Sequence, residues 1–389
     1  MMGNRYDKYK DSGIAWIGEI PEHWEVTSFK RKITINNGKD YKDFLDAEVY
    51  PVMGSGGCFA YCSNYIYDGE ALLLGRKGTI DKPLYVKGKF WAVDTMFYAI
   101  PHADLYCKFA YYLALMFPFN LYSTSTSLPS LTQTDLGNIL VAFPFLSEQQ
   151  AIAAYLDQKC GEIDELITLQ EEMITKLQSY KQSVITEAVT KGLDKNVPLK
   201  DSGIKWIGKI PEHWKITKVQ YLAQLKSGYN LTTEEITDNG LYPVYGGNGI
   251  RGYYDKYFLE GDYVLIGRQG ALCGNINYST NKSWATEHAV VCYPKIKYVT
   301  RWFGELLRVM NLNQYSLAAA QPGLAVERIK LLPIPIIPLS EQQAIADYLD
   351  QRCSEIDELI SIKQQKIEKL KEYRKSLIFE CVTGKRKVS

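Results

Sequence analysis

The stretch LSEQQAIAAYLDQKCGEIDELI at residues 146–167 is nearly repeated as LSEQQAIADYLDQRCSEIDELI at residues 339–360, an offset of 193 residues. A second pair lies upstream of these, with KDSGIAWIGEIPEHW at residues 10–24 and KDSGIKWIGKIPEHW at residues 200–214, an offset of 190 residues. Because the two offsets nearly agree, the chain is one long tandem duplication. A repeat of this length predicts two similar domains related by an internal pseudo-two-fold axis, each with one copy of the same kind of site.

The segments between the repeated motifs differ much more between the two copies. YPVMGSGG at residues 50–57 still matches YPVYGGNG at 242–249, and LLLGRKG at 72–78 still matches VLIGRQG at 264–270, but little identity survives around them. Drift of surface loops explains such differences in part. Since whole segments differ and not only loop tips, we favour a fixed scaffold that carries two different recognition domains.

Each repeated LSEQQ motif is expected to open a long helix, because Ser147 with Gln150, and Ser340 with Gln343, have the spacing of a capping box. Beyond the motifs, apolar residues recur at steps typical of a coiled coil. In the two copies they are Ile163, Leu166, Met173, Leu177, Tyr180 and Val184, and Ile356, Leu359, Leu370, Tyr373 and Leu377.

Each helix should span about 40 residues, or about 60 Å, and end near Gly192 or Gly384, where glycine can stop a helix. Neither helix is apolar enough to stand alone, so we expect the two to pack antiparallel against each other.

The predicted fold class is α+β, with two mixed β-rich domains joined by two long antiparallel helices. Short aromatic and β-branched runs broken by Gly, Pro and Asn indicate strands, and each copy has one short helical stretch, at 108–116 and 301–310. The predicted division has four parts: residues 1–146 form the first recognition domain, 147–191 the first helical region, 192–339 a linker with the second recognition domain, and 340–389 the second helical region.

The composition limits the class of protein. The 389 residues, 46% of them hydrophobic, can form two to three domains. No apolar run is long enough to cross a membrane and the polar N-terminus has no signal segment, so we predict a cytosolic protein. The eight cysteines show neither a disulfide nor a zinc pattern, so we expect no metal site. A net charge of +1 is weak for a protein that binds nucleic acid alone, although partner subunits can supply part of the phosphate neutralisation.

Few motifs in the chain suggest chemistry. The glycines of Gly247-x-Gly249-x-x-Gly252 match the dinucleotide-binding pattern, but a strand-like segment follows where that fold requires a helix. No Walker loop, nucleophile elbow, HExxH motif or amino-methyltransferase motif is present, so enzymatic chemistry within this chain is not supported.

The strand ends GRKG (75–78) and GRQG (267–270) fit nucleic-acid binding better. Arg76 and Arg268 are equivalent and suit contacts to phosphate, whereas Lys77 and Gln269 differ and suit base readout. An ordinary exposed hairpin is the alternative interpretation of these two segments.

Taken together, SGIxWIGxIPEHW, GRxG and LSEQQAIAxYLDQ resemble the specificity subunits of type I restriction–modification systems (the HsdS family). The resemblance covers both copies. It implies two target-recognition domains that each read one half of a split sequence in double-stranded DNA, and helices that set the spacing and dock two methyltransferase subunits of the HsdM type. Those partners methylate adenine with S-adenosylmethionine, and motor-nuclease subunits of the HsdR type cut DNA with ATP and magnesium. None of these cofactors is expected to bind to this chain.

The candidate site residues follow from these interpretations. The reading loops are predicted at 55–58, 76–79 and 123–130, with counterparts at 248–251, 268–271 and 316–323. The predicted DNA-binding residues are Ser55, Arg76, Lys77, Thr79, Ser123, Thr124, Ser125, Asn248, Arg251, Arg268, Gln269 and Gln321. The predicted partner-binding residues are Gln149, Gln150, Glu162, Gln342, Gln343 and Glu355.

Two other functions remain open at this point. The chain could be the specificity partner of a fused type IIB or IIG restriction–methyltransferase. It could also be a non-enzymatic adaptor with two ligand-binding β-domains.

Overall fold

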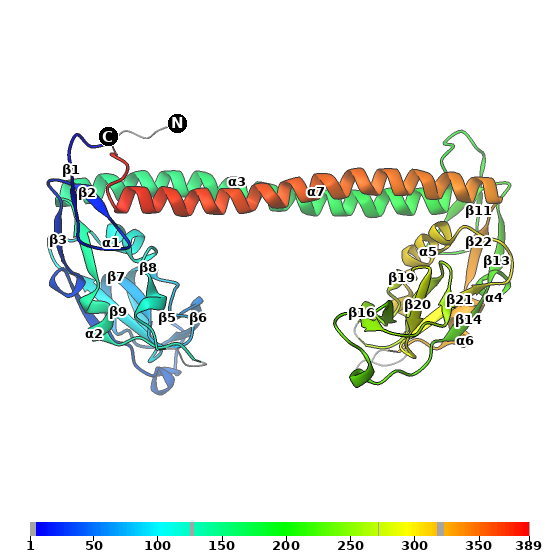
Figure 1. The fold of residues 1–389 in the computed structure, drawn as a ribbon, viewed down its shortest axis with the longest axis horizontal. Helices are drawn as coiled ribbons and strands as arrows, with labels where there is room; N and C mark the ends of the chain where they lie inside the picture. Colours follow the sequence, from blue (N-terminus) through cyan, green and yellow to red (C-terminus); the bar gives the residue numbers. More distant parts are fainter. Residues whose placement is uncertain (1–4, 125–127, 271, 317–322, 389) are drawn as a thin grey trace. The chain divides into compact units, whose positions relative to one another are not determined.

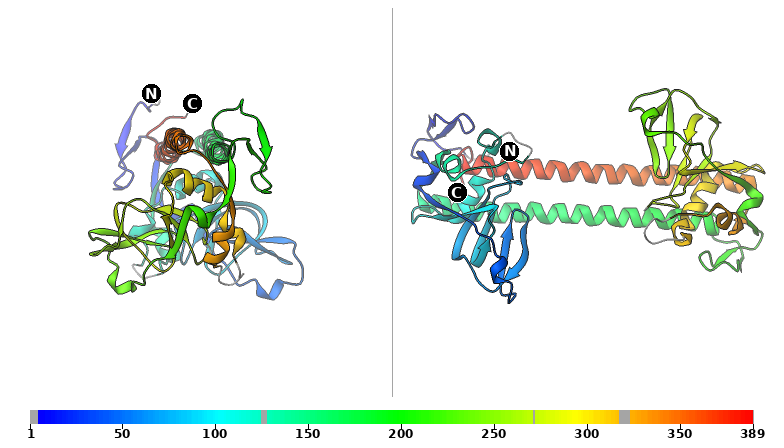
Figure 2. Two further views of the ribbon diagram at one scale, coloured as in Figure 1. Left: turned by 90° about the vertical axis from the view of Figure 1, so that its right-hand side faces the viewer. Right: turned by 90° about the horizontal axis from the view of Figure 1, so that it is seen from below.

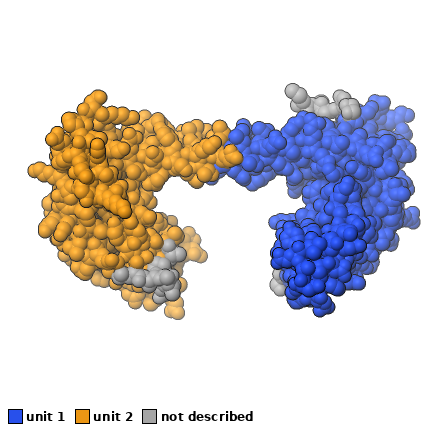
Figure 3. All heavy atoms as spheres, turned by 180° about the vertical axis from the view of Figure 1, so that it is seen from behind, with its two compact units in different colours: residues 1–171, 364–389 blue, residues 172–363 orange. Residues whose placement is uncertain are grey.

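The computed structural model describes residues 5–124, 128–270, 272–316 and 323–388. The chain forms two compact units, drawn in two colours in Figure 3: unit 1 comprises residues 1–171 and 364–389, and unit 2 comprises residues 172–363. The boundary crosses each long helix near its middle, so the units do not coincide with the four segments expected from the sequence. Each unit instead combines a β-rich domain with the start of one long helix and the end of the other.

Unit 1 is built around a six-stranded mixed sheet with the order β4-β9-β7-β8-β5-β6 (Figure 1). Neighbouring strands are antiparallel except for β5 and β8, which are parallel. The strands of this sheet are β4 (Ile33–Asn37), β5 (Tyr50–Gly54), β6 (Gly57–Cys62), β7 (Tyr67–Gly75), β8 (Leu84–Ala92) and β9 (Met96–Pro101).

Smaller elements complete unit 1. β1 (Tyr9–Asp11) pairs with β2 (Glu19–Pro21), and β3 (Glu25–Ser28) pairs with β10 (Leu140–Phe143). The short helices are η1 (Phe29–Arg31), η2 (Lys42–Phe44), α1 (Cys107–Ala114), η3 (Phe119–Leu121) and α2 (Gln133–Asn138).

Unit 2 repeats this strand order, but its sheet is interrupted. Two four-stranded sheets replace the six-stranded one, with the orders β14-β21-β18-β19 and β16-β15-β20-β17. Two short strands stand where unit 1 has the long β7, and two more stand in place of β8. The strands are β14 (Ala223–Ser227), β15 (Tyr242–Gly246), β16 (Gly249–Tyr254), β17 (Leu259–Glu260), β18 (Val264–Gly267), β19 (Ile276–Tyr278), β20 (Lys282–Ala285) and β21 (Ala289–Pro294).

The smaller elements of unit 2 also match those of unit 1. β11 (Leu199–Asp201) pairs with β12 (Lys209–Pro211), and β13 (Lys215–Lys218) pairs with β22 (Pro333–Ile336). The short helices are α4 (Val219–Leu222), η4 (Thr233–Glu235), α5 (Thr300–Val309), η5 (Leu312–Tyr315) and α6 (Val326–Leu331). The predicted mixed domains with one main short helix each, α1 and α5, are therefore confirmed.

The two long helices are α3 (Leu146–Lys191, 46 residues) and α7 (Leu339–Val382, 44 residues). Within each unit they lie side by side (Figures 1 and 2). In unit 2, Lys363 Nζ lies 3.4 Å from Met173 Sδ and Lys181 Nζ lies 2.7 Å from Asp357 Oδ1. As the residue number of the contact increases along α3, from 173 to 181, that of its partner decreases along α7, from 363 to 357. The predicted antiparallel arrangement is therefore confirmed.

Glycine ends both long helices, as predicted. Gly192 and Gly384 have φ values of +74° and +72°, a left-handed conformation that glycine adopts without strain. The amide of Gly192 donates to the Ala188 carbonyl at 3.1 Å, and the amide of Gly384 donates to the Cys381 carbonyl at 3.3 Å.

The core of each unit joins the β-rich domain to both long helices. In unit 1 the core includes Ile152, Leu156 and Cys160 of α3 and Leu377 and Val382 of α7. Unit 2 buries the repeat-equivalent residues Ile345, Leu349, Cys353, Val184 and Val189. Cys160 and Cys353 are each only 3% exposed, so both act as small apolar core residues.

Polar contacts fix α1 and α5 on the long helices. In unit 1 the ammonium of Lys108 pairs with Asp157 of α3, and in unit 2 Arg301 Nε lies 2.8 Å from Asp350 Oδ1 of α7. These residues are repeat-equivalent. The same attachment therefore holds each sheet on its pair of helices.

Two details of the helix prediction are wrong. The helices begin at Leu146 and Leu339, so Ser147 and Ser340 are their second residues and not caps. The expected apolar seam also fails at several positions, because Leu166, Met173 and Tyr180 are 43%, 39% and 49% exposed while Gln170 is only 5% exposed. A helix with a single long neighbour buries one narrow face, and the remaining apolar positions stay on the surface.

Candidate nucleic-acid interface

Three loops meet beyond the end of one strand in each unit. β7 of unit 1 ends at Gly75, and the amide of the next residue, Arg76, donates to the Thr95 carbonyl at 2.8 Å. The Arg76 carbonyl accepts from the amide of Leu131 at 3.0 Å, and Lys77 forms an isolated bridge with Ser130. The predicted reading loop 76–79 thus lies beside Ser130, the last residue of the predicted loop 123–130.

Unit 2 repeats the two backbone hydrogen bonds of the arginine and the isolated bridge of the next residue. The Arg268 amide donates to the His288 carbonyl at 2.8 Å, and its carbonyl accepts from the Leu324 amide at 2.9 Å. Gln269 bridges Gly323, as Lys77 bridges Ser130. The backbone of the two sites is therefore the same, whereas the side chains presented on it differ.

A hollow of about 650 Å³ opens at these loops in unit 2. The predicted residues Asn248, Arg251 and Gln269 line it together, and so does His288. Asn275 Nδ2 donates to Asn248 Oδ1 at 2.7 Å, and His288 Nε2 lies 3.0 Å from Glu287 Oε1. The structure thus gathers amide, guanidinium and imidazole groups, which are the hydrogen-bonding groups suited to base edges.

The two equivalent arginines are anchored in different ways. Arg76 Nη1 donates to the Asp94 carbonyl at 3.3 Å, and its guanidinium lies 5.8 Å from the centre of the Phe97 ring. Arg268 Nη1 donates to Ser227 Oγ at 3.1 Å. Both side chains are half-buried and keep further donors for a ligand.

Of the other predicted residues of the first unit, Lys77, Thr79, Ser123 and Thr124 lie in these loops, and Ser55 lies in the turn between β5 and β6. Lys77, Thr79 and Thr124 are exposed, and Thr124 Oγ1 lies 2.9 Å from Ser130 Oγ. Ser55 and Ser123 are half-buried. Ser125 and Gln321 fall outside the described residues.

Thr95 and His288 were missed by the sequence analysis. They occupy equivalent positions after β8 and β20, and their carbonyls hold the arginine loops. The only sequence signal was that DTM (94–96) aligns with EHA (287–289) close to a repeated tryptophan.

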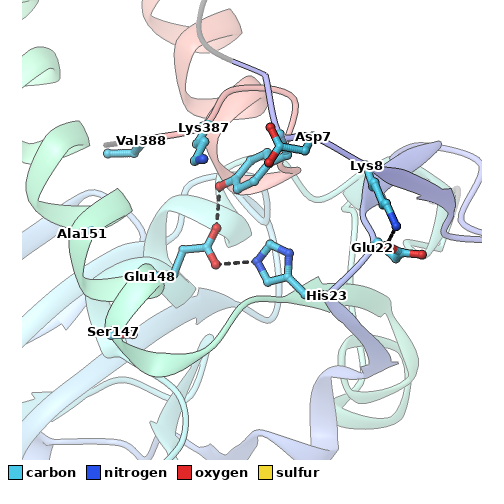
Figure 4. A pocket seen from close by; sticks show the side chains of 10 residues that line it. Asp7, Lys8, Glu22, His23, Ser147, Glu148, Ala151, Lys387 and Val388 are labelled. Atoms are coloured by element: carbon cyan, nitrogen blue, oxygen red, sulfur yellow. Dashed lines mark hydrogen bonds and ion pairs between the residues drawn. The ribbon is translucent and has the colours of Figure 1, made fainter.

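The repeated PEHW and LSEQQ motifs meet at the start of each long helix. In unit 1 the Glu148 carboxylate accepts from the Tyr6 hydroxyl at 2.5 Å and lies 2.8 Å from His23 Nε2 (Figure 4). It also accepts from Trp24 Nε1 at 3.2 Å. Burial, followed by the neighbouring carboxylate, raises the pKa of Tyr6, so the phenol stays protonated and donates. In unit 2, Glu341 is contacted in the same way by His213 at 2.8 Å and Trp214 at 3.0 Å.

The structure corrects the partner-binding role expected of Gln149 and Gln342. These side chains are only 1% and 3% exposed. Gln149 Nε2 donates to the Pro144 carbonyl at 2.9 Å, and its Oε1 accepts from the Tyr106 amide at 2.8 Å. Gln342 forms the same two bonds with the Ile337 carbonyl and the Val299 amide, both at 2.9 Å. Both glutamines therefore join a long helix to its own β-rich domain.

The remaining predicted partner-binding residues lie on the helix surface. Gln150 and Gln343 are exposed. Glu162 Oε2 pairs with Lys159 at 2.7 Å and Glu355 Oε2 pairs with Arg352 at 2.5 Å, each within its own helix. The hydrogen bond from Lys159 lowers the pKa of Glu162, so this carboxylate carries its charge at neutral pH.

Comparison with known proteins identifies this arrangement. The sequence profile of the family described as "Type I restriction modification DNA specificity domain" matches the chain twice, at residues 21–178 and 211–372. The chain belongs to this family. Membership confirms the resemblance seen in the sequence, together with the prediction that the chain is a specificity subunit and not a catalytic one.

Two curated relatives illustrate the range of similarity. The EcoprrI specificity subunit of Escherichia coli is 38% identical over 150 residues, which is 36% of this chain and 37% of that protein. The MjaVIII specificity subunit of Methanocaldococcus jannaschii is 23% identical over 95% of this chain and 94% of its own length.

Solved structures share the fold. A chain from a study titled "Structural basis underlying complex assembly and conformational transition of the type I R-M system" has a TM-score of 0.73 at 16% identity, over 93% of this chain and 98% of that chain. The HsdS subunit of Thermoanaerobacter tengcongensis has a TM-score of 0.52 at 16% identity, over 94% and 98%. The predicted α+β class with two repeated domains and a long helix pair is thus confirmed for this specificity-family chain.

Among the described residues no group of His, Cys, Asp or Glu side chains could hold a metal ion. None of the helices in that same part has the length and apolar character needed to span a bilayer.

Proposed function

We propose that this chain is the DNA specificity subunit of a type I restriction–modification complex and that each unit reads one half of a bipartite target. One observation carries the proposal: beyond β7 and β18 the same backbone bonds of the arginine and the same isolated bridge present Lys77 in one unit and Gln269 in the other. Lysine suits the acceptors of guanine, and glutamine suits the edge of adenine. Two readers with different side chains can recognise two different half-sites.

The equivalent arginines have a different role in this proposal. Arg76 and Arg268 hold the same place in both units, which fits contacts to phosphate that carry no sequence information. With a net charge of +1, much of the phosphate neutralisation falls to the methyltransferase and motor-nuclease subunits. S-adenosylmethionine, ATP and magnesium would bind to those partners and not to this chain.

Methylation by the assembled complex tests the proposal. Cells that express this chain with its methyltransferase subunits should show adenine methylation at one bipartite sequence, whereas the purified chain with S-adenosylmethionine should transfer no methyl group. Cells that express the methyltransferase subunits alone serve as the control. Methyl transfer by the lone chain, or bipartite methylation in the control cells, would contradict the assignment.

The docking surfaces are proposed on one flank of the long helices. Unit 1 exposes Leu166, Leu169 and Tyr373 by 43%, 47% and 51%. Unit 2 exposes the repeat equivalents Leu359, Ile362 and Tyr180 by 47%, 53% and 49%. A turn of about 100° per residue puts the two leucines of α3 on one side of the buried face. Two identical partners need two equivalent surfaces, and the repeat supplies them.

Replacing one leucine in each of the two docking surfaces should remove the two partner subunits one at a time. We expect Leu166→Asp to reduce the methyltransferase content of the complex from two copies to one, and Leu166→Asp with Leu359→Asp to abolish assembly, because a carboxylate would be buried in an apolar contact. Native mass spectrometry measures the stoichiometry. Thr168→Asp, on the opposite flank of α3, is the matched control and should leave two copies bound. Two copies bound to the double variant would exclude this surface.

A further inference from the structure

A β-bulge occurs at the same place in the β5–β6 hairpin of unit 1 and in the β15–β16 hairpin of unit 2. In unit 1, Val52 pairs with Ala60 and Met53 pairs with Cys58, so the register passes over Phe59. In unit 2, Val244 pairs with Gly252 and Tyr245 pairs with Ile250, so the register passes over Arg251. Such bulges turn one side chain away from the regular alternation of a strand and are frequent next to functional sites.

A glycine on the facing strand makes room for each bulged side chain. A Cβ atom added at Gly54 would lie 3.2 Å from the Phe59 ring, and one added at Gly246 would lie 2.4 Å from Arg251 Cδ. Both side chains thus extend across the hairpin over the same backbone position. The repeat has kept the bulge and the glycine while the bulged residue itself differs.

Both bulged side chains are directed into the solvent. Phe59 is 59% exposed, although its ring packs edge-on against Tyr41 with a centroid distance of 5.8 Å. Arg251 is exposed and lines the same hollow as Gln269 and His288. The contact with Tyr41 and the bulge hold the Phe59 ring in one place while most of it stays open to a ligand.

We propose that the bulged residues are the paired specificity-determining side chains of the two units, with Phe59 reading one position of the first half-site and Arg251 one position of the second. This inference rests on the proposed function. The two chemistries select different bases: an arginine fork binds the O6 and N7 acceptors of guanine, whereas a phenyl ring contacts the methyl group of thymine. The bulge places one side chain at the same position in each unit, and the different residue at that position selects a different base.

The test compares methylated sequences in cells that express each variant with its methyltransferase subunits. Arg251→Lys keeps the charge but removes the fork, and we expect preference at one base pair of the second half-site to fall about tenfold or more, with the first half unchanged. Phe59→Ala should relax one position of the first half-site only. Tyr61→Ala is the matched control, because Tyr61 is also exposed on β6 but is paired with Pro51.

The outcomes separate this inference from the proposed function. If the wild-type complex gives no bipartite methylation, the proposed function itself fails. If the wild-type complex methylates a bipartite target and both variants methylate the same target unchanged, the bulged residues do not determine specificity. A variant that loses methylation at all sites equally, with its sequence preference intact, would assign the residue to phosphate contact and would also overturn the inference. Thermal denaturation of each variant shows whether a loss of methylation comes from unfolding.

Discussion

Replacing residues 215–338 with residues 25–145 of the same chain is expected to convert the target into one in which both halves are the first half-site. The recognition domains end at equivalent points, because β3 pairs with β10 and β13 pairs with β22 at the same distance from the long helices. The helical surfaces that receive them are nearly identical: Val184, Ile185 and Val189 match Leu377, Ile378 and Val382. The transplanted domain should therefore fold on the second site.

Mapping of methylated adenine in cells measures this result. The reciprocal chimera, with residues 215–338 in place of 25–145, is the matched control and should give two second half-sites. A target that retains both original halves would show that recognition lies outside the exchanged segments. A target altered in both halves by a single exchange would contradict the assignment of one unit to one half-site.

Trp214→Ala is expected to destabilise unit 2 by about 3–5 kcal/mol, which is the usual cost of removing a buried tryptophan. Trp214 is fully buried, donates to Glu341 at 3.0 Å and packs against Gly192 at the end of α3, where a Cβ atom would lie 3.2 Å from the indole. One side chain therefore joins the PEHW segment, the start of α7 and the end of α3. Its loss leaves a cavity at the meeting point of all three.

Chemical denaturation followed by circular dichroism measures the change in the free energy of unfolding. Trp214→Phe keeps most of the packing and loses the hydrogen bond, so it should cost clearly less. Tyr221→Ala removes an aromatic side chain that is 60% exposed and should change stability by no more than about 0.5 kcal/mol. Equal effects of the two alanine substitutions would show that the indole does not hold the three segments together.

Much of the architecture was predictable because it rests on local patterns. The offsets of 190 and 193 residues indicated two copies, and Gly192 and Gly384 marked the ends of the long helices because glycine readily stops a helix. Asn248 and Arg251 of one predicted reading loop and Gln269 of another line one hollow, while their contact with DNA stays a prediction. Glycine and charge signals at strand ends are visible in the sequence without any knowledge of the packing.

Only the tertiary structure shows which of these side chains are buried, which are exposed and what they contact. Gln149 and Gln342 looked like surface residues for a partner, but their amides satisfy backbone groups of another segment, and no local pattern shows this. Leu166 looked like a seam residue and is 43% exposed, because only the packing of a helix determines which of its apolar flanks is covered. Phe59 was overlooked because a bulge is a property of pairing between two strands. The sequence by itself determined the repeat, the helices and the class of function, since these depend on spacing along one chain. Which glutamines join a helix to its own domain, which flank of a helix stays exposed and which residues are bulged depend on which distant segments meet, and only the folded chain determines that.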